Sequence, residues 1–421
     1  MRPALSHSSL FCSKSSLGKR NVLIVGAGIA GPVLAYFLHR FGLQPVVVER
    51  TPQLRTAGQT IDLRDAGREV ARRMGIESAI RERMTQDGGV AFVDTAGRTR
   101  AAFGADSFGG RGLVSDIEII RSELVKILYE RSCHNTEYIF GDQPLSINDH
   151  GDSVQVTFAS GNTREFDLVV GADGLRSRTR QLVFGDISPI HHLNIYIAYF
   201  TIPYDKADGR WSRWYNAPRG RTMFLRPDNL GTTRAVLSFR SKHRDYEDLS
   251  IESQKSLVEK LFVDAGFETP RVLAGLKNAE DFYFEAIGQV KMNRWSQGRV
   301  TLVGDAGYCA SPVSGMGTTL AFVGAYILAG ELGRHQDHTK AFQQYETLMR
   351  PYVTDAQKIL PVAMRLTTPE TRAGVALLHT AMSAVARVVN SPLFSKFTSK
   401  KSTDKISLPS YETLIGHSMT P

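Results

Sequence analysis

Three stretches rich in glycine, two of them with an aspartate, have the residue types that bind phosphates and sugar hydroxyls. Glycine lets a backbone turn sharply and approach a phosphate, and a carboxylate accepts hydrogen bonds from a ribose. The chemistry that they predict is the binding of a dinucleotide. The stretches are Gly26-Ala27-Gly28-Ile29-Ala30-Gly31, Gly171-Ala172-Asp173-Gly174 and Gly304-Asp305-Ala306.

The first stretch lies between a predicted strand and a predicted helix. The apolar run 21–25 is rich in β-branched residues, which favours a buried parallel strand, and 32–43 has apolar residues at helical spacing. A second apolar run, 45–48, is followed by Glu49 and Arg50. The acid lies about 20 residues after the glycines, where a carboxylate accepts hydrogen bonds from a ribose hydroxyl.

Each position of the first stretch then has a physical reason. Gly26 permits the turn, Gly28 lets the backbone approach a pyrophosphate, and Gly31 lets the helix pack closely on the sheet. The start of the helix, with Ile29 and Ala30, faces the phosphates with free N–H groups.

The other two stretches also end predicted strands. The runs 166–170 and 299–303 are apolar and lead into Asp173-Gly174 and Gly304-Asp305. A loop then opens a long predicted helix that continues through Leu332. That loop contains Pro312, Gly315, Met316 and Gly317.

The three motifs in this order resemble the single-component (class A) flavoprotein monooxygenases of the aromatic-hydroxylase type. The segment Gly58-Gln59-Thr60-Ile61-Asp62-Leu63-Arg64 is similar to the one that follows the second strand in tetracycline-inactivating members. The motifs are also similar to those of fungal secondary-metabolite monooxygenases. The resemblance covers residues 19–350, most of the chain.

The resemblance implies one FAD and assigns residues to it. Asp173 and Gly174 lie close to FAD and NAD(P)H, Asp305 binds the ribose and pyrophosphate, and Arg121 contacts the phosphate region. The loop with Gly315, Met316 and Gly317 lies against the isoalloxazine ring. The implied fold is α/β: a Rossmann-like FAD-binding domain with an inserted, mostly antiparallel β-sheet substrate domain and a C-terminal helical extension.

The resemblance also implies an activity. NADH or NADPH reduces FAD, O2 forms a flavin C4a-hydroperoxide, and one oxygen atom passes to an aromatic or natural-product-like small molecule by hydroxylation or epoxidation. Two alternatives stay open: a flavoprotein oxidase or dehydrogenase on the same fold, and a non-catalytic FAD-binding scaffold. No second GxGxxG is present for NAD(P)H, which favours its transient binding.

The chain departs from the family at two places. Gly307-Tyr308 stands where members usually have Ala-His, and Gly324-Ala325 stands where many have Asp-Ala. We expect the first change to alter the local loop and to leave FAD binding intact.

The motifs predict how the chain is divided. We expect a tail at 1–19, a discontinuous FAD-binding domain at 20–75, 108–185 and 290–350, and a substrate-binding domain at 76–107 and 186–289. Residues 351–421, punctuated by prolines, should form the C-terminal helical extension.

Candidate substrate contacts gather in one stretch of the predicted sheet. Aromatic rings stack on planar molecules, and arginine pairs with acidic or phenolate oxygens. For each residue a place in the core is at least as good an interpretation, and no catalytic base is named. The candidates are Arg213, Tyr215, Arg219, Arg221 and Phe224, with Pro312 from the loop.

Composition limits the remaining classes. The net charge is 51 − 42 = +9 over 421 residues, but the basic residues are spread out, so we expect no nucleic-acid partner. The three cysteines and eleven histidines form no spaced metal set. The sequence is compatible with a monomer and does not fix the oligomeric state.

Location follows from the same features. Three unpaired cysteines indicate an intracellular, cytoplasmic protein. No segment has the roughly 20 uninterrupted apolar residues of an integral membrane span. The serine-rich N-terminus suits a transit peptide or a disordered tail, and 373–389 suits a core helix or a peripheral membrane contact.

Overall fold

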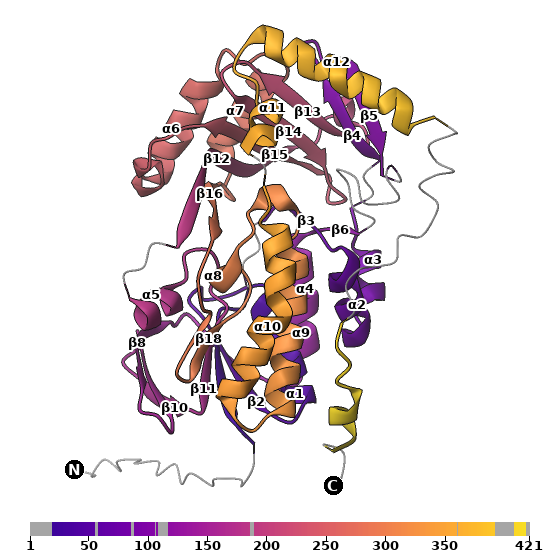
Figure 1. Cartoon of the computed structure of the whole chain (residues 1–421). Helices are drawn as coiled ribbons and strands as arrows, with labels where there is room; N and C mark the ends of the chain where they lie inside the picture. The colour runs from indigo at the N-terminus through magenta and orange to yellow at the C-terminus, as the bar shows by residue number, and fades with distance from the viewer. Residues whose placement is uncertain are drawn as a thin grey trace, which may run out of the picture.

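The computed structural model describes residues 19–54, 58–85, 88–105, 107, 117–185, 189–359, 361–391 and 408–417. The predicted tail at 1–19 therefore falls almost entirely outside the described residues. Two lobes lie one above the other, each built on its own sheet (Figure 1). The α/β fold predicted from the three motifs is confirmed.

The lower lobe contains a six-stranded sheet that carries all three motifs at the ends of its strands. Every neighbouring pair is parallel except the edge pair β17–β18. The central strands are valine-rich and almost fully buried, as expected of a parallel sheet covered on both faces. The order is β17 (Ser296–Gln297), β18 (Val300–Leu302), β11 (Leu168–Gly171), β1 (Asn21–Val25), β2 (Gln44–Glu49) and β7 (Glu137–Phe140).

Helices pack around α9 (Gly317–Arg334), in which every residue from Thr318 to Leu332 is buried. Its neighbours are α1 (Ala30–Arg40), α2 (Asp65–Met74) and α10 (His338–Ala356), and α4 (Arg121–Ser132) lies against α1. The shorter helices of this lobe are α3 (Glu77–Glu82), η2 (Cys133–Asn135), α5 (Arg178–Phe184), α8 (Asp305–Tyr308) and η5 (Pro312–Ser314). Two small antiparallel sheets complete it: β10 (Thr163–Phe166), β9 (Val154–Phe158) and β8 (Pro144–Asp149), and β3 (Thr60–Asp62) with β6 (Glu118–Ile120).

The upper lobe is built on a seven-stranded sheet that is antiparallel except between β13 and β4. One face packs on α6 (Ile251–Phe262) and α7 (Thr269–Asn278). The order is β16 (Tyr283–Val290), β12 (Ile190–Pro203), β15 (Thr232–Arg240), β14 (Arg221–Pro227), β13 (Ser212–Ala217), β4 (Gly89–Val93) and β5 (Thr99–Gly104), with the 3-10 turns η3 (Lys206–Asp208) and η4 (Asp245–Asp248).

The C-terminal part visits both lobes. After α10, the helices α11 (Pro361–Thr367) and α12 (Arg372–Val389) cross the upper lobe, where α12 packs on β5 (Figure 1). The described segment that includes η6 (Glu412–His417) lies on the lower lobe. There Tyr411 is buried and donates a hydrogen bond of 2.6 Å to Glu331 of α9.

Among the described helices, none has the length and hydropathy needed to cross a membrane.

Candidate functional site

The turn between β1 and α1 is held by close backbone contacts. Gly26 has φ +112°, and its N–H donates to the carbonyl oxygen of Val48 at 2.7 Å. A Cβ at 26 would lie 2.7 Å from the carbonyl oxygen of Ala172, so the first and second motifs touch. A Cβ at Gly31 would overlap the carbonyl oxygen of Gly26. These two glycines are required by the protein itself.

Gly28 differs from these two glycines. Among the described residues, a Cβ there would meet one atom within 4 Å, a guanidinium nitrogen of Arg121 at 3.5 Å. The protein therefore leaves space on this side of the turn, next to a cation and the start of α1. A pyrophosphate fits such a cradle, because anions bind at helix N-termini and beside arginine.

Glu49 holds the glycine turn. One carboxylate oxygen accepts from the Ala27 N–H at 2.9 Å, and the other accepts from the N–H and hydroxyl of Thr51 at 3.1 and 2.9 Å. The ribose contact expected of this carboxylate stays a prediction. Arg50, the next residue, is exposed.

Arg121 begins α4 and connects two parts of the site. Its N–H donates to the Gln59 carbonyl oxygen at 3.0 Å, and its side chain passes beside Gly58 toward Gly28. Its charge also acts on Asp305. The arginine expected at the phosphates thus lies between the first motif and the third.

Asp173 uses its carboxylate inside its own turn. It accepts from the Ser177 hydroxyl at 2.5 Å and from the Thr179 N–H and hydroxyl at 2.9 and 3.0 Å. Gly174 follows with φ +82°. The carboxylate therefore shapes the turn that leads into α5, and its predicted closeness to the cofactor remains to be tested.

Arg180, which the sequence analysis did not single out, ties the second motif to the third. Its buried guanidinium donates to the carbonyl oxygens of Ala306 at 2.7 Å and Leu175 at 2.8 Å. Burial lowers the pKa of Arg180, and the nearby Asp173 opposes that shift. The run 176–180 contains three arginines, and sequence alone does not indicate which of them turns inward.

Asp305 is the first residue of α8. Asp305 is exposed, yet the surrounding protein desolvates its carboxyl and raises its pKa, while Cys309 and Arg121 oppose the shift. Cys309 itself is buried, in line with a packing role. A Cβ at Gly317 would lie 4.0 Å from the Asp305 carboxylate, so the third motif adjoins the loop before α9.

That loop is shaped by unusual backbone conformations. Ser311 has φ +79°, rare for a residue with a side chain, and Gly315 is left-handed at φ +62°. A Cβ at Gly315 would lie 3.6 Å from Asp62, which pairs with Arg64 at 2.7 Å. The segment 58–64 therefore lies beside the loop, and Met316 precedes the first residue of α9.

The chain matches the family described as FAD binding domain over residues 19–358. It belongs to this FAD-binding family. A flavin-dependent monooxygenase of Legionella longbeachae is 39% identical over 339 residues, which is 80% of this chain and 87% of that protein. An FAD-dependent monooxygenase of Sarocladium schorii is 33% identical over 423 residues, 93% of this chain and 98% of that protein.

Solved structures agree on the fold. Tetracycline destructase Tet(51) superposes with a TM-score of 0.77 at 32% identity, covering 94% of this chain and all of that one. Klebsiella pneumoniae HpxO complexed with FAD and uric acid has a TM-score of 0.71 at 19% identity, covering 90% of this chain and 96% of that one. The predicted flavin-dependent monooxygenase family, with its tetracycline-inactivating and fungal members, is confirmed.

The substrate candidates fall on different sides of the seven-stranded sheet. Tyr215 donates to the Ala265 carbonyl oxygen, Arg213 pairs with Asp208 and Glu268, and Arg221 pairs with Asp264 at 2.6 Å. All three lie on the face that packs against α6 and α7. Arg219 lies in the turn between β13 and β14, where it is exposed and pairs with Asp264.

Only Phe224 and Pro312 are placed elsewhere. Phe224 lies on the opposite face of the sheet, against Trp214 with ring centroids 5.2 Å apart, and Pro312 is exposed in the loop before α9. Alternation along β13 and β14 gives each side chain a face, but the sequence does not indicate which face looks toward the FAD-binding lobe. We therefore do not include the other four candidates in the proposed pocket.

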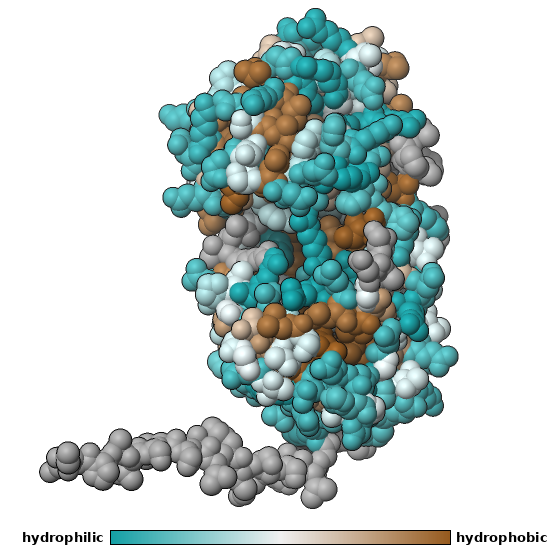
Figure 2. Space-filling model, turned by 90° about the vertical axis from the view of Figure 1, so that its left-hand side faces the viewer, coloured by the Kyte–Doolittle hydropathy of each residue, from teal (hydrophilic) through white to brown (hydrophobic). Residues whose placement is uncertain are grey.

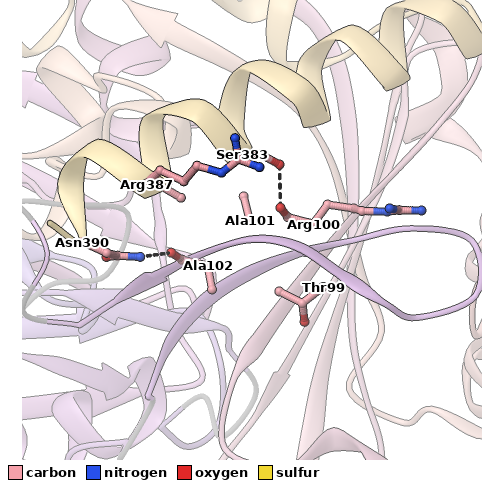
Figure 3. A pocket seen from close by; sticks show the side chains of 8 residues that line it. Thr99, Arg100, Ala101, Ala102, Ser383, Arg387 and Asn390 are labelled. Carbon is pink, nitrogen blue, oxygen red and sulfur yellow. Dashed lines mark hydrogen bonds between the residues drawn. The ribbon is translucent and has the colours of Figure 1, made fainter.

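A shallow groove of about 350 Å³ runs between α12 and β5 (Figure 3). The Ser383 hydroxyl donates to the Arg100 carbonyl oxygen at 2.5 Å, and the Asn390 amide donates to the Ala102 carbonyl oxygen at 3.0 Å. These bonds satisfy carbonyl groups on the edge strand and fasten the helix to the sheet. None of the three motifs contributes a residue to the groove, so we interpret it as a packing contact between α12 and β5 and not as a binding site.

Within the described residues, no cluster of histidine, cysteine, aspartate and glutamate side chains is arranged to hold a metal ion.

Proposed function

We propose that this member of the family is a monooxygenase that uses NADPH or NADH and O2 to hydroxylate or epoxidise an aromatic or natural-product-like small molecule. The observation that carries the proposal is the convergence of the three distant motifs and the loop before α9. Gly26 lies against Ala172, Arg180 bonds to Ala306, and Asp305 lies beside Gly317. One extended cofactor along these contacts explains why they converge.

The residues fit the parts of FAD in sequence. The Gly28 cradle, the start of α1 and Arg121 suit the pyrophosphate, and Asp305 suits a hydroxyl of the sugar chain. When bound, FAD supplies the redox chemistry and the activation of O2. The proposed cofactor residues are Gly26, Gly28, Ile29, Ala30, Gly31, Glu49, Arg50, Arg121, Asp173, Gly174, Asp305, Gly315, Met316 and Gly317.

The protein's own part is to position the substrate and exclude water. The loop 311–317 and the side of the seven-stranded sheet away from α6 and α7 supply the two walls. That side carries an apolar cluster of Ile195, Ile197, Tyr199 and Ile287, to which Met364 of α11 adds. An apolar, aromatic lining suits a planar organic molecule. In Figure 2, apolar surface is visible near the level where the lobes meet, surrounded by hydrophilic side chains.

The first experiment is an absorbance spectrum of the purified protein before and after anaerobic NADPH. We expect flavin bands that bleach with NADPH and return with air. Product formed under oxygen-18 gas should then contain one labelled atom. A product without label, formed with consumption of O2, would instead identify an oxidase, and a colourless protein that takes up no added FAD would contradict the proposal.

The relatives suggest which substrates to test. The similarity to the tetracycline destructase Tet(51) makes tetracyclines the first compounds to screen, followed by other aromatic natural-product-like molecules of the proposed substrate class. Turnover is measured as NADPH oxidation that depends on the added compound.

A further inference from the structure

Glu285 on β16 faces the space between the two lobes. Side chains alternate along a strand, and Phe284 and Ala286 pack on the α6–α7 side. Ile287 and Gln289 therefore share the other side with Glu285. The Gln289 amide lies 3.4 Å from the Ala310 carbonyl oxygen, in the segment just after the third motif. The Glu285 side chain thus looks toward the loop proposed to hold the flavin ring.

The surroundings of this carboxyl are aromatic and apolar. The Tyr283 hydroxyl donates to Glu285 at 2.8 Å, and the Tyr283 ring stacks on Tyr199 with centroids 6.2 Å apart. Tyr199 is buried, and Ile197 is the register partner of Glu285 on β12. This is a polar group set into the apolar wall of the proposed pocket.

The charged neighbours leave the carboxyl without a cation of its own. Arg176, at the second motif, pairs with Glu247 of η4, and Glu247 also accepts from the Ala286 N–H at 2.8 Å. Within the described residues no lysine or arginine forms an ion pair with Glu285. Glu285 is half-buried beside the exposed Tyr283, and a carboxyl in such a partly apolar setting is costly to ionise unless polar groups meet it.

The electrostatics suit proton exchange near neutral pH. Burial raises the pKa of Glu285 to about 7, the Tyr283 hydrogen bond and the more distant Arg176 oppose this, and the charges of Asp305 and Glu247 add to it. Burial likewise raises the pKa values of the facing Tyr199 and Cys309 well above their usual range. Burial also raises the pKa of Asp305, whose charge acts on Glu285.

We infer that Glu285 recognises a hydroxyl group of the substrate and accepts its proton, so that the enzyme selects phenols and enols. This inference rests on the proposed monooxygenase function. In the step, the substrate O–H bond breaks, the proton passes to a carboxylate oxygen of Glu285, and the electron pair stays on the substrate oxygen. The resulting phenolate or enolate has a more electron-rich carbon, which is the atom that an electrophilic oxygen attacks.

The first test measures binding with matched ligands. The FAD-loaded enzyme is titrated with phenols and their methyl ethers, such as 2-naphthol with 2-methoxynaphthalene and orcinol with its dimethyl ether, and dissociation constants are read from the flavin spectrum. At pH 8 we expect at least one phenol to bind about tenfold or more tighter than its ether, because hydrogen bonds to charged groups are strong. Glu285→Gln should abolish that preference. A wild-type enzyme that prefers no phenol, or a variant that keeps the preference, would overturn the inference.

The second test uses pH and a neighbouring control. The phenol preference should rise with pH, with a midpoint near 7 in the wild type. Tyr283→Phe removes a hydrogen bond that favours the ionised form, so its midpoint should move upward while the preference survives at high pH. An unchanged midpoint in Tyr283→Phe would assign the titration to another group and contradict the inference.

FAD content separates this inference from the proposed function. We expect Glu285→Gln to bind FAD, because Glu285 lies on the seven-stranded sheet, whereas the three motifs lie on the six-stranded sheet. Loss of FAD in this variant would make Glu285 a cofactor residue and overturn the inference. Failure of the wild type to bleach with NADPH or to incorporate labelled oxygen would instead count against the monooxygenase function itself.

Discussion

The hydroxyl of Tyr308 occupies the space that a Cβ at position 324 would need. That hydroxyl lies 2.9 Å from the hydroxyl of Tyr345, which is 3.0 Å from the carbonyl oxygen of Leu302. The side chains of Tyr308 and Tyr345, together with Gly324, are buried between α8, α9 and α10. The chain differs from the pattern of the aromatic-hydroxylase family at Tyr308 and Gly324, and these two residues are therefore sterically coupled.

This coupling predicts the behaviour of the family residues when they are introduced singly. Gly324→Asp should destabilise the protein by more than about 3 kcal/mol, because the carboxylate would overlap a buried tyrosine. Tyr308→His together with Gly324→Asp should recover much of that loss. Urea unfolding of the two single variants and the double variant gives the coupling free energy, and a value near zero would contradict the coupling.

Two similar substitutions in the first motif should have different effects, one on FAD binding and the other on the stability of the protein. Gly28→Ala should leave the FAD-free protein within about 0.5 kcal/mol of the wild type, because among the described residues its Cβ meets one guanidinium nitrogen at 3.5 Å. It should weaken FAD binding, since the side chain enters the cradle. Gly31→Ala should destabilise even the FAD-free protein by more than about 2 kcal/mol. Melting temperatures with and without FAD distinguish the two, and equal behaviour would refute the assignment of the cradle.

Arg180 should be required for the contact between the second and third motifs. Arg180→Lys leaves carbonyl groups at Ala306 and Leu175 without their donors, so we expect a loss of about 2–4 kcal/mol and weaker FAD binding. Arg178→Lys is the matched control, because Arg178 is exposed and donates a hydrogen bond to the Pro144 carbonyl oxygen. Equal effects of the two substitutions would show that Arg180 has no special role.

Asp305→Ala should separate cofactor binding from stability. The variant should hold little or no flavin, because the carboxylate that suits the sugar chain is gone. Its FAD-free form should be as stable as the wild type or more so, since burial raises the pKa of this carboxyl and makes its ionised form unfavourable. Flavin absorbance per protein and the melting temperature of the FAD-free form are the two measurements. A fully yellow variant would sink the assignment.

Glu285 predicts a pH dependence of folding. Its pKa is about 7 in the folded protein against an ordinary 4.5, so the folded state binds the proton more tightly than the unfolded chain. The stability that this protonation supplies is present below pH 4.5 and is lost as the pH rises through 7, a change of about 2–3 kcal/mol. Glu285→Gln should therefore flatten the decline in unfolding free energy between pH 5 and 8, whereas the exposed control Glu280→Gln should not.

The sequence predicted the elements that depend on local residue patterns. It did not predict the direction in which individual side chains point, because that depends on how distant elements pack together. Apolar runs located β1, β2, β11 and β18, and the glycine spacing located the turn at Gly26, because both follow from short-range sterics. The orientation of Tyr215 toward α6 and α7 and the inward turn of Arg180 depend on which elements pack together. Glu285 was missed because nothing near it in sequence marks a strand residue as facing a cleft.

The sequence order of the elements limits when the lower lobe can fold during synthesis. β1 is the first strand of the six-stranded sheet along the chain, but β18, which pairs with β11, starts only at residue 300. The helix α9 follows it, and Tyr411 hydrogen-bonds to Glu331 of that helix. At roughly 5–20 residues per second, a nascent chain exposes the apolar face of α1 for tens of seconds before α9 leaves the ribosome. The core of the lower lobe can therefore form only after residues 300–334 have been synthesised, long after β1 and α1.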